Sequence, residues 1–123
     1  YPTGEIADVT DTELDFRGPR AITVHHPDLD NNFCLSDGPV PLREVLWLSG
    51  ASGVSLTMAT DQPGVQVYDG RHAIRPGKAP YEGIAIEAQG WPDAPTHRAF
   101  PSIRVTEHKP YRQFTAFSFA KTA

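Results

Sequence analysis

The chain has 123 residues, of which 39% are hydrophobic and 21% are charged, a balance that suits one globular domain with a real core and excludes a disordered or fibrous chain. The net charge is −4 and the isoelectric point is near 5.6, and the basic residues are scattered along the chain, so we expect no binding to nucleic acid. No apolar run approaches the roughly 20 residues that cross a bilayer, and we therefore expect no membrane role.

The single cysteine, Cys34, cannot form an internal disulfide. This favours a reducing compartment, and the expected location is cytoplasmic. The sequence opens on Tyr1 instead of Met and shows no signal peptide, so we interpret its start as a cut.

Short runs of β-branched and aromatic residues recur between clusters of Gly, Pro, Asn and Asp, whereas helical periodicity is hard to find. The pattern predicts an all-β protein, and its 10 Gly and 12 Pro are typical of a β-sandwich with many loops. We see no repeat and no linker, so residues 1–123 are expected to form a single structural unit. In chain order, the predicted strands are 6–9, 21–24, 32–35, 44–49, 54–59, 65–68, 83–87, 102–105 and 112–119.

Two connections have clear turn chemistry. Residues 49–53 (SGASG) predict a hairpin turn, and the Pro63-Gly64 pair within 61–64 suits a type II turn. Phe114, Phe117 and Phe119 alternate imperfectly in the last predicted strand, so we expect both of its faces to be buried.

Three polar residues interrupt otherwise apolar strand starts or cores. Asp30 lies in an Asp- and Asn-rich stretch just before an apolar run, where a solvated turn is the simpler interpretation. Gln66 separates Val65 and Val67, and Glu87 follows an apolar run that ends in a turn rich in Gly and Pro. The alternation predicts that Glu87 lies near a strand end, on the face opposite the isoleucines of its run.

A metal or a nucleotide cofactor is not expected. Of the five histidines only His25 and His26 are adjacent, and neighbouring residues on a strand point to opposite faces. The chain has no zinc-ligand spacing, no GxSxG elbow and no phosphate-binding glycine pattern.

Two carboxylates and an amide suit a sugar, whose hydroxyls are recognised by paired acceptors and donors, and Tyr68 or Trp91 would supply an apolar wall. The same residue types also suit glycoside hydrolysis, which needs a second carboxylate roughly 5–10 Å from Glu87. From the residues alone, an enzyme and a lectin remain equally defensible.

Five stretches resemble the C-terminal half of the aldose 1-epimerases, or hexose mutarotases, in the same order and with similar spacing. They are PTGEI at 2–6 with TELDFR at 12–17, DNNFCL at 30–35, TDQPGVQVYDG at 60–70, GIAIEAQGWPDAP at 83–95 and FPSIRV at 100–105. The match covers nearly the whole chain, and the third and fourth stretches are the specific ones.

The resemblance implies an antiparallel β-sandwich of the galactose mutarotase type, of which residues 1–123 would be the C-terminal portion. It also implies cofactor-free interconversion of the α and β anomers of a free aldohexose such as glucose or galactose. By the same resemblance, Glu87 is the general base on the anomeric hydroxyl, and Asp30 and Gln66 bind sugar hydroxyls.

Two departures from the family pattern stand out. Asn31 occupies a position where the family usually has histidine. The family's general-acid histidine belongs to an N-terminal half, so we expect this chain to need an N-terminal fragment as a second chain, or otherwise to self-associate. The alternatives are a non-catalytic sugar-binding or regulatory β-sandwich and a phosphosugar epimerase, which would need a basic cluster for phosphate.

Overall fold

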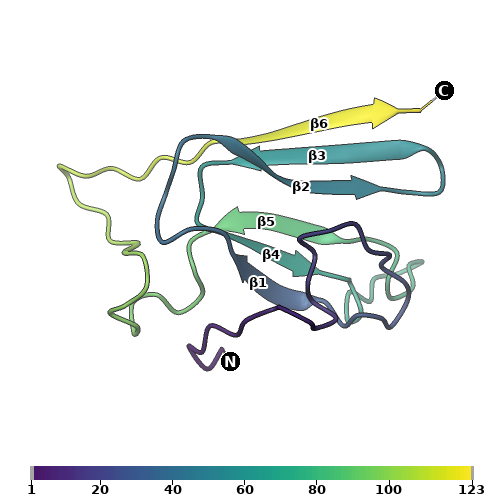
Figure 1. Ribbon diagram of the computed structural model, residues 1–123, viewed down its shortest axis with the longest axis horizontal. Helices are drawn as coiled ribbons and strands as arrows, with labels where there is room; N and C mark the ends of the chain where they lie inside the picture. Colours follow the sequence, from purple (N-terminus) through teal and green to yellow (C-terminus); the bar gives the residue numbers. More distant parts are fainter. Residues whose placement is uncertain (1, 123) are drawn as a thin grey trace.

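The computed structural model describes residues 2–122, which form two three-stranded antiparallel sheets (Figure 1). The all-β prediction is therefore confirmed. One sheet has the order β1-β4-β5 and the other has the order β2-β3-β6. The strands are β1 (Asp30–Cys34), β2 (Arg43–Ser49), β3 (Val54–Thr60), β4 (Gly64–Tyr68), β5 (Ala85–Gln89) and β6 (Thr115–Lys121).

The β1-β4-β5 sheet has one apolar and one polar face, because side chains alternate along each strand. Phe33 lies opposite Val65, and Val67 lies opposite Ile86, on the apolar face. Val65 and Val67 are 2% and 7% exposed, so the central strand β4 is well covered on this side.

The β2-β3-β6 sheet is built around a hairpin, as the sequence of residues 49–53 predicts. β2 and β3 pair from Arg43 opposite Thr60 to Ser49 opposite Ser55, with one irregularity between Glu44 and Leu46. β6 then pairs with β3 over its whole length.

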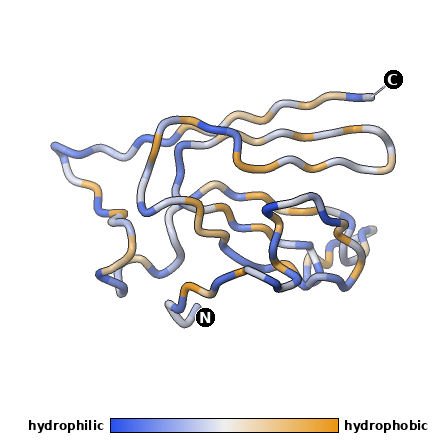
Figure 2. The backbone as a smooth tube through the Cα atoms, viewed as in Figure 1, coloured by the Kyte–Doolittle hydropathy of each residue, from blue (hydrophilic) through white to orange (hydrophobic). Residues whose placement is uncertain are grey.

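The core lies between the two sheets. Met58 of β3 is fully buried and clusters with Val65, Val67 and Leu29, the residue just before β1. Partly buried residues packed against this cluster come from both sheets and from the N-terminal segment; they include Leu14, Phe16, Phe33, Leu46 and Ile86. Figure 2 shows the hydrophobic stretches that run along the strands of both layers.

Part of the apolar surface of the second sheet is uncovered. Phe117 lies opposite Met58 and Phe119 lies opposite Leu56, yet these two phenylalanines are 49% and 72% exposed. β6 is an edge strand of its sheet, drawn at the top of Figure 1. The prediction that both faces of this strand are buried is therefore wrong for the described chain, because every residue of β6 after Thr115 is exposed.

Three predicted strands are absent. Residues 6–9, 21–24 and 102–105 form no ladder, although an isolated bridge joins Thr23 of the second run to His26, which lies beyond it. Their apolar side chains are at least half exposed in most cases, such as Ile6 at 55% and Val105 at 57%. β propensity alone does not make a strand there, since no neighbouring strand of the described chain offers backbone partners.

The connection at residues 61–64 also differs from the prediction. Gly64 is not among the glycines with positive φ, as a type II turn would require, and it is already the first residue of β4. The segment carries the chain from one sheet to the other, because β3 and β4 belong to different sheets. The type II prediction is therefore wrong.

The β2–β3 hairpin depends on one glycine. Gly53 has a φ of 79°, and an added Cβ would lie 2.9 Å from Oγ1 of Thr122. We therefore expect Gly53→Ala to lower the free energy of unfolding by about 1–2 kcal/mol. Urea denaturation measures this. Gly50→Ala in the same turn is the control and should change stability by less than about 0.5 kcal/mol, since its nearest neighbour to an added Cβ is Ser52 Oγ at 3.8 Å. Equal effects of the two substitutions would contradict the prediction.

Candidate functional site

The candidate functional side chains lie on the polar face of the β1-β4-β5 sheet. The register places Asp30 opposite Tyr68, Asn32 opposite Gln66, and Gln66 opposite Glu87. Alternation puts these side chains on the face opposite Val65, Val67 and Ile86, so the apolar positions that build the core also orient the polar ones away from it.

A hollow of about 400 Å³ lies over this face and is lined by Asp30, Gln66, Tyr68, Glu87 and Gln89. The structure thus brings together all three candidate residues of the sequence, although they are 36 and 21 residues apart along the chain. A hollow of this size accommodates a monosaccharide.

Hydrogen bonds organise the floor of the hollow. Gln66 Nε2 donates to Asp30 Oδ1 at 2.8 Å, and Gln89 Nε2 donates to Asn32 Oδ1 at 3.2 Å. The bond from Gln66 fixes the orientation of its side chain and leaves its carbonyl oxygen and one N–H free to meet a ligand.

Glu87 lies at the centre of β5 and not near a strand end, which corrects the sequence expectation. The strand continues through Ala88 and Gln89, and these two residues pair with Val65 and Gly64 of β4. The side chain of Glu87 is exposed and lines the hollow. A carboxylate in the middle of a paired strand is held more rigidly than one on a loop. This rigidity suits proton transfer at a fixed point.

Gln89 is a lining residue that the sequence reasoning missed. The signal was present, because Gln89 follows Glu87 by two residues and therefore shares its face. Trp91, in contrast, does not line the hollow. It is 7% exposed and donates its indole N–H to the carbonyl of Pro63 at 2.9 Å. Of the two aromatic residues considered as a sugar wall, the structure places only Tyr68 in the hollow.

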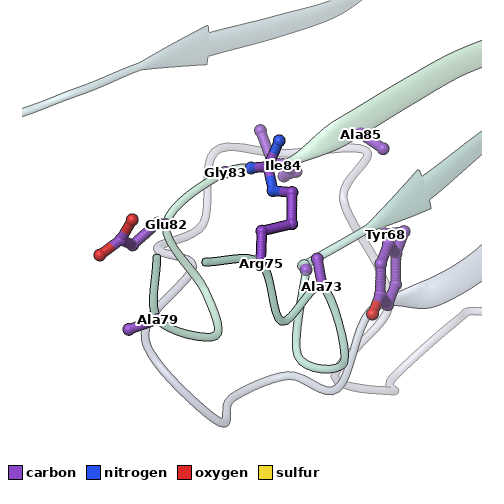
Figure 3. Close-up of a pocket in the computed structure, with 9 residues that line it drawn as sticks. Tyr68, Ala73, Arg75, Ala79, Glu82, Gly83, Ile84 and Ala85 are labelled. Atoms are coloured by element: carbon purple, nitrogen blue, oxygen red, sulfur yellow. The ribbon is translucent and has the colours of Figure 1, made fainter. Parts of the chain in front are cut away.

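A second hollow of about 350 Å³ lies beside the first, between the ends of β4 and β5 and the loop that joins them (Figure 3). Tyr68 lines both hollows. Its hydroxyl accepts a hydrogen bond from the backbone N–H of His72 at 2.7 Å, which holds the ring between them. Arg75 and Glu82 are the charged residues around the second hollow, and they come from the loop.

None of the five histidines lines the first hollow. His25 and His26 belong to a tight turn, where His25 Nδ1 lies 2.7 Å from the hydroxyl of Tyr81. Within residues 2–122, no three His, Cys, Asp or Glu side chains are grouped so that they could hold a metal ion. Cys34 lies 3.7 Å from Asn32 Nδ2, and desolvation raises the pKa of its thiol, which keeps it protonated at neutral pH.

The part of the chain that the structure describes contains no helix long and apolar enough to cross a membrane. The chain is thus an all-β protein of two antiparallel sheets. One of these sheets presents carboxylates and amides, which are hydrogen-bonding groups, over a hollow. The chain belongs to the aldose 1-epimerase family, whose model matches residues 1–118. The resemblance seen in the sequence motifs is therefore confirmed.

Sequence and structure comparisons with individual relatives agree with this family assignment. The chain is 33% identical to the galactose mutarotase of Homo sapiens and 34% identical to that of Rattus norvegicus, and each match covers 97% of this chain. The crystal structure of a GalM/aldose epimerase homologue from C. elegans superposes with a TM-score of 0.79 and 26% identity, over 99% of this chain. The chain spans 38% of the length of these two mutarotases and 41% of the C. elegans chain. Its sandwich therefore has the mutarotase-type fold.

Proposed function

We propose that this chain carries the base and sugar-binding half of an aldose 1-epimerase that interconverts the α and β anomers of a free aldohexose such as galactose or glucose. The observation that supports this most directly is the convergence of Glu87, Asp30 and Gln66 on one hollow. Residues 1–123 would then be the C-terminal portion of one mutarotase-like sandwich.

In this proposal Glu87 removes the proton from the anomeric hydroxyl as the bond between the anomeric carbon and the ring oxygen breaks. The ring oxygen takes a proton from a general acid, and the product is the open-chain aldehyde. Rotation about the bond to the aldehyde carbon and re-closure reverse both proton transfers, so Glu87 returns its proton and no cofactor is consumed.

Asp30 and Gln66 orient the sugar for this step. The 2.8 Å bond between them holds an acceptor and a donor side by side, the pairing that vicinal hydroxyls require. We expect Asp30→Asn to raise KM about tenfold or more with a smaller effect on kcat, since it weakens a charge-assisted hydrogen bond to substrate. Polarimetry of fresh α-galactose measures both constants. The control is Asp37→Asn, an exposed loop residue outside the hollow, and a matching rise in KM there would contradict the assignment.

The general acid would be a histidine on an N-terminal segment of the same protein, bound as a second chain. Two observations support this part of the proposal. No histidine of the described chain lines the hollow, and Phe117 and Phe119 form an uncovered apolar surface beside a free sheet edge. On the basis of its single cysteine, we also propose a cytoplasmic location.

Intact mass under denaturing conditions, followed by polarimetry, tests the proposal. The protein purified from its own source should contain a second polypeptide beside the 13.5 kDa chain, and that complex should accelerate mutarotation of α-galactose and α-glucose. A stable monomer of this chain with mutarotase activity would refute the need for the second chain. A complex without activity would refute the enzymatic proposal.

The second candidate is a sugar-binding or regulatory β-sandwich without turnover. The absence of histidine from the lining of the hollow favours it for this chain taken alone. Saturable binding of galactose, without acceleration of mutarotation by either the chain or its complex, would identify this function.

A further inference from the structure

A buried acidic residue lies immediately after the site strand β4. Asp69 follows Tyr68, and its side chain is 8% exposed. It does not line the first hollow. A buried carboxylate is costly unless it is fully partnered, so its partners indicate what it is for.

The first partner is the backbone of Leu29, the residue just before β1. The Asp69 N–H donates to the carbonyl of Leu29 at 3.0 Å, and Asp69 Oδ2 accepts the N–H of Leu29 at 3.2 Å. Both backbone polar groups of Leu29 are therefore bonded to one residue. Because Asp30 pairs with Tyr68 in the ladder, this tie lies one residue outside the hollow.

Arg71 completes the arrangement. Its Nε lies 3.1 Å from Asp69 Oδ1 and its Nη2 lies 2.9 Å from Asp69 Oδ2, while Nη1 lies 3.0 Å from Asp28 Oδ2. One guanidinium thus connects the residue after β4 to the stretch that leads into β1. A planar guanidinium makes such a fork, which an ammonium group cannot reproduce.

The ionisation state of Asp69 is consistent with its ion pair to Arg71. Burial raises the pKa of the Asp69 carboxyl, but hydrogen bonds from Arg71 and from the Leu29 amide outweigh burial, and the net pKa lies below the ordinary value. Asp69 therefore stays ionised, as the fork to Arg71 requires.

We propose that Asp69 and Arg71 are positioning residues that fix the start of β1, so that the Asp30 carboxylate stands against Gln66 in the hollow. Asp30 itself is exposed, so the geometry of its bond to Gln66 depends on where its backbone is held. This inference rests on the proposed function for its effect on catalysis, whereas its effect on geometry does not depend on that function.

The first measurement is the side-chain amide resonance of Gln66 in the 15N-labelled chain. In Arg71→Met we expect it to move to the position of a solvent-exposed glutamine amide, because Asp30 no longer accepts its hydrogen bond. The backbone amide of Glu87 should not move. An unchanged Gln66 resonance in a folded variant would overturn the proposal.

Residues 15–17 provide a matched control, since Asp15 and Arg17 form the same fork two residues apart, with Nε at 2.8 Å. Neither lines the hollow. Arg17→Met should leave the Gln66 resonance in place. If Arg71→Met does not fold, Arg71→Lys replaces it; this variant keeps the charge beside Asp69 and should shift the resonance less, in the same direction. No shift in the lysine variant would also overturn the proposal.

The second measurement is mutarotation by the complex that contains this chain. Arg71→Met should raise KM for galactose about tenfold, with kcat within about twofold, because it disturbs the binding of hydroxyls and leaves Glu87 in place. A fall in kcat with unchanged KM would overturn the positioning role. If the unsubstituted complex is inactive, the proposed function fails, and the Gln66 resonance still decides whether Asp69 and Arg71 hold Asp30.

Discussion

Replacing Glu87 by glutamine is expected to lower kcat for mutarotation by about 10²–10⁴-fold, the usual contribution of a positioned general base. Glutamine keeps the size and polarity of the side chain but cannot accept the proton of the anomeric hydroxyl. Binding should change little, because Gln66 and Asp30 remain. Polarimetry of fresh α-galactose with the complete complex measures the rate, and titration with the sugar measures affinity.

Glu44→Gln is the matched control for that substitution. Glu44 is also an exposed glutamate on a strand, but it belongs to β2, in the other sheet. Its replacement should leave kcat unchanged. The assignment of Glu87 as general base fails if Glu87→Gln retains full activity, or if Glu44→Gln loses as much.

The largest effect on stability is expected for Met58→Ala, which should lower the free energy of unfolding by about 2–5 kcal/mol. Met58 is fully buried between the sheets, where it belongs to one cluster with Val65 and Val67. Truncation leaves a cavity where the two layers meet. Urea denaturation with an unchanged m-value measures the loss.

Ile74→Ala is the control for Met58→Ala. Ile74 is a comparable apolar residue that is 76% exposed on the loop between β4 and β5, so its truncation should cost less than about 0.5 kcal/mol. A small loss for Met58→Ala, similar to that of Ile74→Ala, would show that the two sheets do not depend on this contact.

Local sequence patterns predicted strands well where an adjacent strand exists. Six of the nine predicted runs became the six strands of the structure, with boundaries displaced by up to about three residues. The runs at 6–9, 21–24 and 102–105 have similar propensity but no partner in the described chain. Pairing is a property of the whole fold, and no local pattern supplies it.

Local patterns likewise identified individual site residues, but not which of them lie side by side. Alternation with apolar neighbours identified Gln66 and Glu87 as side chains that point away from the core, and motif resemblance added their proposed roles. The register then determined that Gln66 lies between Asn32 on one side and Glu87 on the other. Gln89 shares the face of Glu87 by alternation alone, so it could have been predicted from the sequence. The choice between Tyr68 and Trp91 as the aromatic wall could not, because only the tertiary structure shows that Trp91 lies in the interior.

By itself the sequence determined the all-β class, the turn between β2 and β3, and membership of the aldose 1-epimerase family, because these depend on residue order, alternation and local motifs. Only the tertiary structure decided which side chains meet. Asp30 and Gln66 are hydrogen-bonded, and Asp69 ties the backbone before Asp30, because antiparallel pairing brings residues 28–30 beside residues 68–71.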